Sequence, residues 1–295
     1  MSSFDVIVIG QGFAGLTAAK LATERGLRTA NLEAEMFGGL IVNVNELDPG
    51  PGGEHGSGVD VASNLAMANM EAGIEQVSEA ARAIARSGNI LTVTTDGGSY
   101  SAPRVILATG ARFTALGIPG EDSFVGRGVS HCADCDGPMY VGKDTVVVGG
   151  GDSAFQEALA LAQYAGKVTL VYRGATPGAR ADLVARAGAE AKIVQLANTQ
   201  PVAILGGDGV DGVRVSRGGA EETIACAGVF IFAGLTPNSE CAPAEAARDA
   251  AGGLVVDAKC ATSVPGLWAI GAVRAGYGGT LDDAAADAAR AVAAL

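Results

Sequence analysis

The sequence of 295 residues is long enough for two domains of ordinary size, each with its own hydrophobic core. With 44 Gly, 48% hydrophobic residues and 5% aromatic residues, it is typical of a Gly- and Ala-rich α/β protein, and this composition excludes a disordered chain. The net charge is -12 and no run of Lys or Arg occurs, which excludes a basic surface for nucleic acid or for an anionic membrane.

The cellular compartment is predicted from the termini and the cysteines. The N-terminus passes from Met1 straight into a strand pattern, without the basic region, apolar core and cleavage site of a secretory signal. No apolar run is long enough to span a bilayer, so we expect a cytoplasmic protein. The five cysteines are an odd number with one close pair, and in a reducing compartment this favours a working dithiol over a structural disulfide framework.

Residues 4–33 predict a dinucleotide-binding unit, in which a buried strand, a glycine turn, a helix and a second strand follow one another. In the turn, Gly10 permits the tight bend, Gly12 lets the backbone approach a pyrophosphate, and Gly15 lets the helix pack on the strand. Glu33 ends the second strand, where a carboxylate bonds an adenosine ribose hydroxyl. The whole fingerprint reads Gly10-Gln11-Gly12-Phe13-Ala14-Gly15.

The next stretch is less informative. The adjacent glycines of Gly38-Gly39-Leu40 would let the chain pass close to a flat ring system, although an ordinary glycine turn would look the same. Residues 59–72 predict an amphipathic helix with Met67 and Met70 as core residues, and His55 is expected in an exposed loop. Residues 90–95 and 99–102 predict a hairpin, and a buried strand over 104–108 follows.

The segment Ser130-His131-Cys132-Ala133-Asp134-Cys135-Asp136-Gly137 carries the chemistry. Two cysteines at this spacing close a disulfide reversibly when one thiol is held partly as thiolate, and Asp136 can give or take the proton. Half of a zinc site or a pair of buried thiols would show the same spacing. The other three cysteines stand at spacings unsuited to zinc, so we expect no metal.

A second nucleotide unit follows the dithiol. It has a strand over 144–148, the turn Gly149-Gly150-Gly151-Asp152-Ser153-Ala154, a helix over 155–163 and a strand over 167–172. Where Glu33 ends the first unit's second strand, this unit has Arg173, followed by Arg180. Cations there suit the 2′-phosphate of NADP, although Arg173 alone would also fit a plain surface charge. The repeat implies two dinucleotides that serve one dithiol.

The end of the chain returns to the first unit. Residues 229–233 predict a buried strand, residues 234–238 a crossing, and residues 253–257, 267–271 and the helix 282–295 the completion of the first domain. The sequence therefore predicts an α/β fold with two Rossmann-like three-layer nucleotide-binding domains, the second inserted into the first. The expected boundaries are 1–114 and 237–295 for the first domain and 115–236 for the second.

On these motifs the chain resembles the low-molecular-weight thioredoxin reductase family over essentially its whole length. The resemblance rests on five segments: Val8–Gly15, Val105–Ala111, Leu116–Glu121, Gly126–Gly137 and Val146–Ala154. It implies FAD on the discontinuous domain, NADPH (with NADH possible) on the inserted one, a homodimer, and a thioredoxin-like protein or a small disulfide as substrate. It also implies that the domains alternate in orientation, with hinges near 113–116 and 235–239.

The resemblance also implies roles for single residues. Cys135 is the thiol nearest the flavin, Cys132 is the exposed thiol that exchanges with substrate, and Asp136 is the proton donor and acceptor. The implied NAD(P)H-binding residues are Gly149, Gly151, Asp152, Ser153, Ala154, Glu157 (beside the nicotinamide), Arg173 and Arg180. The implied FAD-binding residues are Gly10, Gly12, Phe13, Ala14, Gly15, Glu33, Gly39, Leu40, Asn45, Thr109, Gly110, Gly271, Ala272, Gly279, Thr280 and Leu281.

The chain departs from the family at the cofactor sites. Ala272 stands where the family has an Asp that bonds the flavin's ribityl chain. Either Asp282 or Asp283 replaces that Asp, or FAD binds more weakly than in the family. Tyr172-Arg173-Gly174 replaces the family's His and tandem Arg pair, and Tyr277-Gly278-Gly279 replaces Tyr-Arg-Gln. These changes indicate a divergent member.

Four functional hypotheses follow. The leading one is an FAD-dependent disulfide reductase that takes electrons from NAD(P)H and passes them through Cys132 and Cys135. The alternatives on the same fold are a flavin-dependent dithiol oxidase with O2 as acceptor and a reductase fed by ferredoxin. A non-catalytic flavin-binding or redox-sensing module is a third class, but such a module would need no dithiol.

Overall fold

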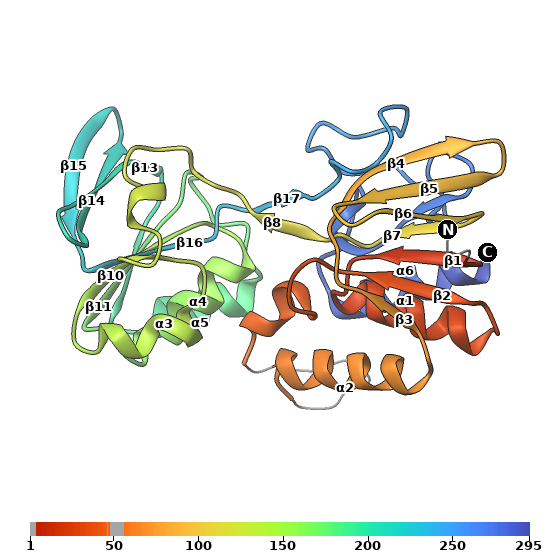
Figure 1. Ribbon diagram of the computed structural model, residues 1–295. Coiled ribbons are helices and arrows are strands. Elements are labelled where there is room, and N and C mark those ends of the chain that lie inside the picture. The colour runs from red at the N-terminus through yellow and green to blue at the C-terminus, as the bar shows by residue number, and fades with distance from the viewer. Residues whose placement is uncertain (1–3, 46, 48–55) are drawn as a thin grey trace. The chain divides into compact units, whose positions relative to one another are not determined.

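A computed structural model describes residues 4–45, 47 and 56–295. The chain forms two compact units, Met1–Arg112 with Thr236–Leu295, and Phe113–Leu235 (Figure 1). The second unit is thus inserted into the first, and the chain crosses from one to the other twice. The crossing strands, β8 (Ala111–Phe113) and β17 (Leu235–Pro237), pair with each other in a two-stranded sheet.

The first unit is built on a parallel sheet of five strands in the order β18-β7-β1-β2-β3. All four residues of β1 are buried, as expected for a parallel strand covered on both faces. The strands are β1 (Val6–Ile9), β2 (Thr29–Leu32), β3 (Glu75–Val77), β7 (Val105–Leu107) and β18 (Leu267–Ala269).

Helices and a second sheet cover the two faces of this parallel sheet. Val6 and Val8 of β1 belong to a core cluster with helices α1 and α6, whereas Ile7 and Ile9 belong to a cluster with a three-stranded antiparallel sheet. This alternation is the period of two that a strand imposes. The covering elements are α1 (Phe13–Glu24), α2 (Gly58–Glu71), α6 (Leu281–Ala293), β4 (Ala81–Ser87), β5 (Ile90–Thr95) and β6 (Ser99–Ala102).

The second unit repeats this three-layer plan. Its parallel sheet has the order β12-β11-β10-β16-β9, and an antiparallel sheet β13-β14-β15 covers one face. Val147 of β10 packs towards α4 and α5, and Val146 and Val148 pack towards the antiparallel sheet. The elements are β9 (Val129–Ser130), β10 (Asp144–Val148), β11 (Lys167–Val171), β12 (Ile193–Leu196), β13 (Thr199–Gly206), β14 (Val210–Arg217), β15 (Ala220–Ala225), β16 (Gly228–Ile231), α4 (Asp152–Ala162) and α5 (Ala181–Ala189).

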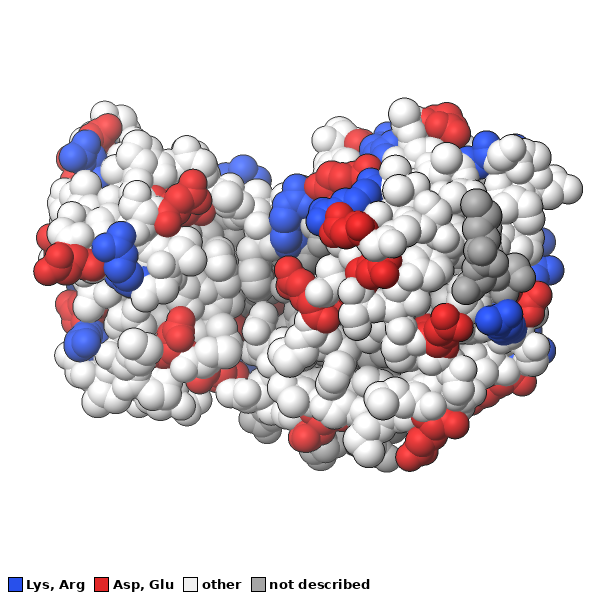
Figure 2. Space-filling model, in the orientation of Figure 1, with Lys and Arg blue, Asp and Glu red and all other residues white. Residues whose placement is uncertain are grey.

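Short helices lie beside the expected sites. The four-residue helix α3 (Ala133–Asp136) contains Cys135, and η4 (Gly137–Tyr140) follows it directly. The other 3-10 helices are η1 (Gly39–Asn43), η3 (Asp122–Phe124) and η5 (Gly271–Val273). No helix in the described part of the chain is long and apolar enough to span a membrane. On the face drawn in Figure 2, basic side chains are interspersed with acidic ones and form no continuous basic patch.

Most predicted elements are present, and the predicted fold class of two three-layer units is confirmed. The elements that the sequence patterns did not predict include β3, β4, β9, α3, α5 and the strands β12–β15. Residues 253–257 form no strand, and Leu254 makes only isolated bridges. The prediction that Met67 and Met70 are core residues is wrong, because they are 59% and 67% exposed and α2 buries small residues instead. His55 lies outside the described residues.

Candidate active site

The glycine turn of the first unit leaves no room for side chains beneath α1. Gly10 has a φ of +103°, and a Cβ on it would lie 2.3 Å from the carbonyl oxygen of Ala108. A Cβ on Gly15 would lie 2.0 Å from the carbonyl oxygen of Gly10. The predicted roles of these glycines therefore have a direct steric basis: the first turn of α1 rests on the strand-end backbone.

The N-terminus of α1 is open for an anion. Gly12 is its N-cap residue and no side chain caps the first turn, whereas Ser57 and Thr280 cap α2 and α6 in capping boxes. A Cβ on Gly12 would approach nothing closer than 3.9 Å. Uncapped N–H groups at the positive end of the helix dipole are the arrangement that holds a pyrophosphate.

A cavity of about 490 Å³ adjoins this turn. Its lining includes Gly10, Glu33, Thr109 and Arg112. The Glu33 carboxylate accepts the N–H of Gln11 at 2.9 Å, so it lies at the turn as the ribose-binding role requires. The open amides, the close backbone and this acid together fit a dinucleotide such as FAD.

Several predicted FAD-binding residues come together around the start of α1. The N–H of Gly38 donates to the Gln11 carbonyl at 2.7 Å, which places a Cβ on Gly39 3.3 Å from the Cα of Gly12. Gly271 approaches the same helix, since a Cβ on it would lie 3.0 Å from the Cβ of Ala14. These segments, far apart in sequence, thus enclose one turn.

The remaining predicted FAD-binding residues are more scattered. The Thr109 hydroxyl donates to the Asn238 carbonyl at 2.6 Å, and the Asn238 N–H donates to the Gly110 carbonyl. Phe13 is the buried first residue of α1, Leu40 is in η1, and Asn45 is exposed after η1. Gly279, Thr280 and Leu281 form the start of α6, where Thr280 serves as N-cap.

A buried acid stabilises the segment around Ala272. Asp287 of α6 is fully buried, and its carboxylate accepts the Gly271 N–H at 3.0 Å and the Arg274 Nε at 2.5 Å. Arg290 donates to the other oxygen at 2.5 Å. Burial alone would raise the pKa of Asp287, but the hydrogen bonds from Arg274 and the Gly271 N–H outweigh it and lower that pKa.

The two acids suggested as a replacement at Ala272 lie in the first turn of α6, and their role stays a prediction. Asp283 accepts the N–H and the hydroxyl of Thr280 in the capping box of α6, and Asp282 is exposed. The signal that would have found Asp287 is an acid inside the buried alanine stripe of the last helix, with Arg290 three residues later.

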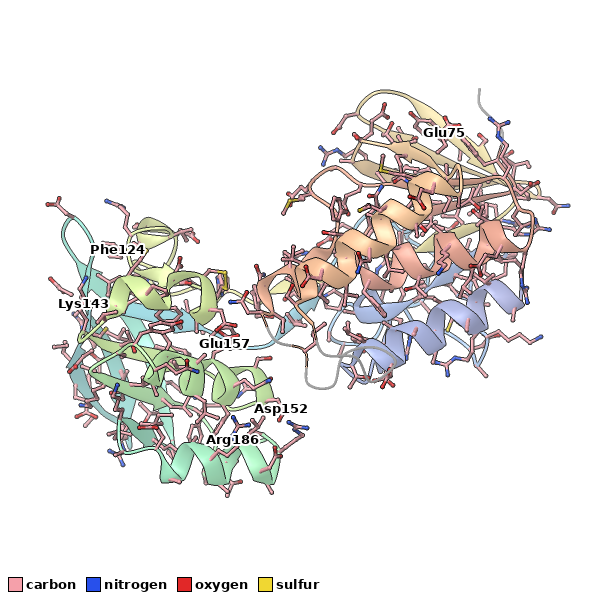
Figure 3. The ribbon with its side chains drawn as sticks, turned by 90° about the horizontal axis from the view of Figure 1, so that it is seen from below. Glu75, Phe124, Lys143, Asp152, Glu157 and Arg186 are labelled. Carbon is pink, nitrogen blue, oxygen red and sulfur yellow. A yellow bond between two sulfur atoms is a disulfide. The ribbon has the colours of Figure 1, made fainter. Side chains whose placement is uncertain are left out.

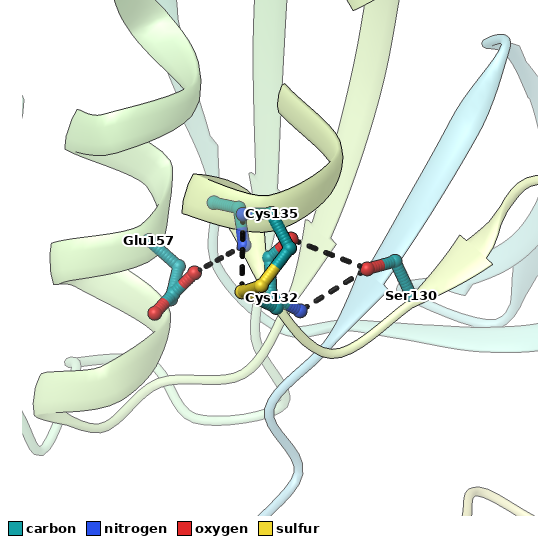
Figure 4. Close-up of a disulfide and its surroundings, with 5 residues drawn as sticks. Ser130, Cys132, Cys135 and Glu157 are labelled. Atoms are coloured by element: carbon teal, nitrogen blue, oxygen red, sulfur yellow. Dashed lines mark hydrogen bonds between the residues drawn. A yellow bond between two sulfur atoms is a disulfide. The ribbon is translucent and has the colours of Figure 1, made fainter. Parts of the chain in front are cut away.

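The dithiol of the second unit is a closed disulfide between Cys132 and Cys135 (Figure 4). Cys132 is the N-cap residue of α3, and its Sγ accepts the N–H of Cys135 at 3.1 Å. The Ser130 hydroxyl accepts the N–H of Cys132 at 3.1 Å. The Glu157 carboxylate accepts the N–H of Ala133 at 2.6 Å. The turn that carries the sulfurs is therefore fixed on two sides.

The exposure of the two cysteines differs from the prediction. Cys132 is only 8% exposed, whereas Cys135 is the exposed member of the pair. The expectation that Cys132 is the exposed thiol is therefore wrong for the oxidised turn. The physical reason is local: Cys132 stands before the first turn of α3, beside the buried Ala133, whereas Cys135 lies on the outer side of the helix.

The other three cysteines are unsuited to exchange. Burial raises the pKa of Cys226 to about 12 and that of Cys241 to about 11, and it also raises the pKa of Cys260. Thiols with such values stay protonated near neutral pH, and the thiolate is the nucleophile. Cys132 and Cys135 are therefore the reactive pair.

A second cavity, of about 640 Å³, lies at the glycine turn of the second unit. It is lined by Gly149, Gly151, Asp152, Ser153 and Ala154 of the turn and by the exposed Arg173. Gly151 is the N-cap residue of α4 and, as in α1, no side chain caps the first turn. The geometry fits a second dinucleotide.

Two predicted nucleotide ligands do not line this cavity. The Arg180 guanidinium lies 3.4 Å from Asp152 and 3.5 Å from Asp182, and its backbone N–H also donates to Asp152. Glu157 lies on the side of α4 that faces α3 and the disulfide, whereas Asp152 begins the same helix (Figure 3).

Two glycine-turn nucleotide sites and one reactive disulfide define a nucleotide-dependent disulfide oxidoreductase. The family model for pyridine nucleotide-disulphide oxidoreductases matches residues 4–292. The thioredoxin reductase of Treponema pallidum is 37% identical over 277 residues, which cover 93% of this chain and 90% of that protein. The crystal structure of Lactococcus lactis thioredoxin reductase is 32% identical, has a TM-score of 0.94, and covers 99% of this chain and 97% of its own.

A thioredoxin reductase structure from T. acidophilum is 29% identical, with a TM-score of 0.93 over 100% of this chain and 98% of its own. The chain therefore belongs to the pyridine nucleotide-disulphide oxidoreductase family. The predicted resemblance to thioredoxin reductases is confirmed, and so is the prediction of an FAD-dependent disulfide reductase. FAD and a pyridine nucleotide are the cofactors that this family implies.

The ion pairs of Asp287 with Arg274 and Arg290 should stabilise the first unit. In Asp287→Asn the guanidinium groups of Arg274 and Arg290 lose a buried counter-charge, and we expect a loss of about 3–5 kcal/mol in the free energy of unfolding. FAD binding should weaken as well, because the Gly271 N–H loses its charged acceptor. Thermal unfolding of the apoprotein and fluorescence titration with FAD measure the two effects.

The contribution of Asp287 to the free energy of unfolding depends on pH. Because the folded pKa of Asp287 is lowered, its contribution is present above the unfolded pKa of about 3.9 and is lost as the pH falls through the folded value. Asp287→Asn should lack this acid-dependent loss. Glu245→Gln, at an exposed acid of the same unit, is the matched control. Equal stability and FAD affinity in Asp287→Asn and wild type would contradict the assigned role.

Proposed function

We propose that the protein passes electrons from NADPH, bound on the second unit, through FAD on the first unit to Cys132–Cys135, and from there to the disulfide of a thioredoxin-like protein. One observation carries the proposal: the reactive disulfide closes on α3, and α3 packs on α4, whose uncapped N-terminus begins at a glycine-turn cavity. The thioredoxin reductase names of the relatives support the choice of substrate. A small disulfide is the alternative substrate.

The first unit's residues account for the flavin site. The open N–H groups after Gly12 would hold the pyrophosphate, Glu33 the adenosine ribose, and the 271–272 segment the ribityl side. When bound, FAD exchanges an electron pair between the pyridine nucleotide and the disulfide. Asp287 would orient the Gly271 N–H at this site.

The chemistry of the dithiol balances with an electron pair and protons. The electron pair breaks the S–S bond and leaves two sulfurs: one takes a proton supplied through Asp136, the residue after Cys135, and the other remains a thiolate. The exposed Cys135 is the sulfur that a flavin on another unit would reach. The Cys132 thiolate would then attack the substrate disulfide and form a mixed disulfide. Cys135 would give its proton to Asp136 and displace the second substrate sulfur as a thiolate, which takes up a proton, so that the Cys132–Cys135 bond is restored.

We infer that NADPH is preferred over NADH by a modest factor. Arg173 is a cation that lines the nucleotide cavity, whereas Arg180 is already paired with Asp152 and Asp182. A single phosphate contact supports a weaker preference than the family's three cations would. The resemblance to thioredoxin reductases further supports a homodimer and a cytoplasmic location.

Anaerobic mixing tests the direction of electron flow. We expect NADPH to bleach the flavin absorbance of the holoenzyme, and added thioredoxin-like disulfide to restore it. Bleaching by dithiols alone would favour the dithiol oxidase, and bleaching by reduced ferredoxin alone would favour the ferredoxin-fed reductase. Either result would refute NADPH as donor.

Removal of one thiol separates the two half-reactions. In Cys132→Ser we expect reduction of the flavin by NADPH to persist while turnover of the disulfide substrate stops, because the final exchange has lost its nucleophile. Stopped-flow absorbance and steady-state turnover measure the two steps. Cys226→Ala, at a buried thiol outside the site, should retain both. Undiminished turnover in Cys132→Ser would refute the assignment.

Nucleotide preference tests the arginines. Arg173→Ala should reduce the ratio of kcat/KM for NADPH to that for NADH by an amount equivalent to about 1.5–3 kcal/mol, the value of a hydrogen bond to a charged group. Arg180→Ala should change that ratio less, because its guanidinium is paired with two acids. A larger effect at Arg180 than at Arg173 would contradict the proposed phosphate contact.

A further inference from the structure

Glu157 contacts the dithiol turn directly. It belongs to α4, the helix that begins at the nucleotide turn, yet it does not line that cavity. Its Oε2 accepts the N–H of Ala133 at 2.6 Å, and this nitrogen is covalently bonded to the carbonyl carbon of Cys132 (Figure 4). One hydrogen bond therefore separates the carboxyl from the backbone of a reactive cysteine.

The surroundings of Glu157 make its charge variable near neutral pH. Burial raises its pKa to about 7, the Ala133 N–H opposes that rise, and the charge of Asp134 on α3 adds to it. Asp136 is the second acid of α3. The core cluster through which α4 packs on β10, β11 and α5 includes Phe155 and Leu161 of α4 itself, and its titratable members are Tyr140 and Tyr172.

We propose that Glu157 is a positioning residue of the dithiol turn that couples reduction of Cys132–Cys135 to proton uptake by its own carboxyl. The inference rests on the dithiol chemistry of the proposed function. In the oxidised state the Glu157 carboxylate holds the Ala133 N–H and has no neighbouring sulfur charge to oppose it.

Reduction changes this balance. When the electron pair that FAD would supply enters the disulfide, the S–S bond breaks, one sulfur takes a proton through Asp136, and the other remains a thiolate. That thiolate and the Glu157 carboxylate are like charges in a half-buried turn, so Glu157 takes a proton from solvent and becomes neutral. When the thiolate passes its electrons to the substrate and the S–S bond closes again, Glu157 releases that proton.

The measurable consequence is the pH dependence of the dithiol potential. Reduction raises the pKa of Glu157 above its oxidised value of about 7, so one additional proton is taken up between the two values. Over that range the equilibrium constant for reduction should change by a further factor of about ten per pH unit, or about 30 mV for a two-electron couple.

The experiment equilibrates the holoenzyme anaerobically with dithiothreitol redox buffers from about pH 6 to about pH 9, values that bracket the oxidised pKa. Alkylation and mass spectrometry of the peptide with Cys132 and Cys135 then give the reduced fraction. At the acid end of the range we expect the Cys132–Cys135 potential of Glu157→Gln to equal that of the wild type. Above about pH 7 the disulfide of Glu157→Gln should become progressively easier to reduce than that of the wild type. Parallel potential profiles for the two proteins would overturn the proposal.

Asp134→Asn is the matched variant. Burial still raises the Glu157 pKa in this variant and the hydrogen bond to Ala133 remains, but the added effect of the Asp134 charge is lost. The pH range in which the potential changes more steeply should therefore begin at lower pH and still be present. If the steeper pH range of the potential were lost in Asp134→Asn but kept in Glu157→Gln, the assignment to Glu157 would be overturned. Infrared difference spectra of the wild type need no variant: reduction near pH 8 should produce a protonated carboxyl band, and absence of that band would overturn the proposal.

Failure of the proposed function would be seen separately. The titration uses a thiol reductant and no pyridine nucleotide. A protein that NADPH does not reduce but whose potential profile shows the steeper range would contradict the proposed donor and support the coupling. Normal turnover with NADPH, together with parallel potential profiles for the wild type and Glu157→Gln, would support the proposed donor and contradict the coupling.

Discussion

Close backbone contact at two glycine turns is the constraint on which the structure depends. Beneath α1 the carbonyl oxygens of Gly10 and Ala108 occupy the space that a Cβ would need, and beneath α4 a Cβ on Gly149 would lie 2.3 Å from the Phe232 carbonyl oxygen. Both helices can then rest on the carboxyl ends of their parallel strands with uncapped N–H groups. The two cofactor sites are consequences of this packing.

The dithiol is fixed to the second of these helices. Its turn is held by Ser130 from the preceding strand and by Glu157 from α4. The nucleotide turn and the disulfide are therefore joined through the packing of α3 on α4, within a single unit. This arrangement explains how one short helix can present an exposed Cys135 while Cys132 stays buried.

Sequence patterns with local causes were predictable. The strand 144–148 and the hairpin strands 90–95 and 99–102 have the predicted bounds, because buried valines and an Asp-Gly-Gly turn determine them locally. The strand β15 was not predicted because none of its residues is buried and its sequence does not alternate between apolar and polar residues.

Features that depend on tertiary contacts were not predictable in the same way. Asp287 acquires its role from Gly271 and Arg274, which meet it only after α6 packs beside η5. The direction of Glu157 towards Ala133 likewise depends on the packing of α3 on α4. Helical spacing places Glu157 on α4 but does not say which neighbour its carboxylate will meet.

The proposed function requires that FAD and the Cys132–Cys135 disulfide of this protein are both reducible centres that exchange electrons. Anaerobic titration with dithionite, followed by flavin absorbance and by thiol counting, tests it most directly. We expect full reduction of the wild type to consume one electron pair for the flavin and one for the disulfide. Full reduction of Cys135→Ser should consume only the pair taken up by the flavin. Consumption of a single pair by the wild type, with the disulfide still closed, would contradict it.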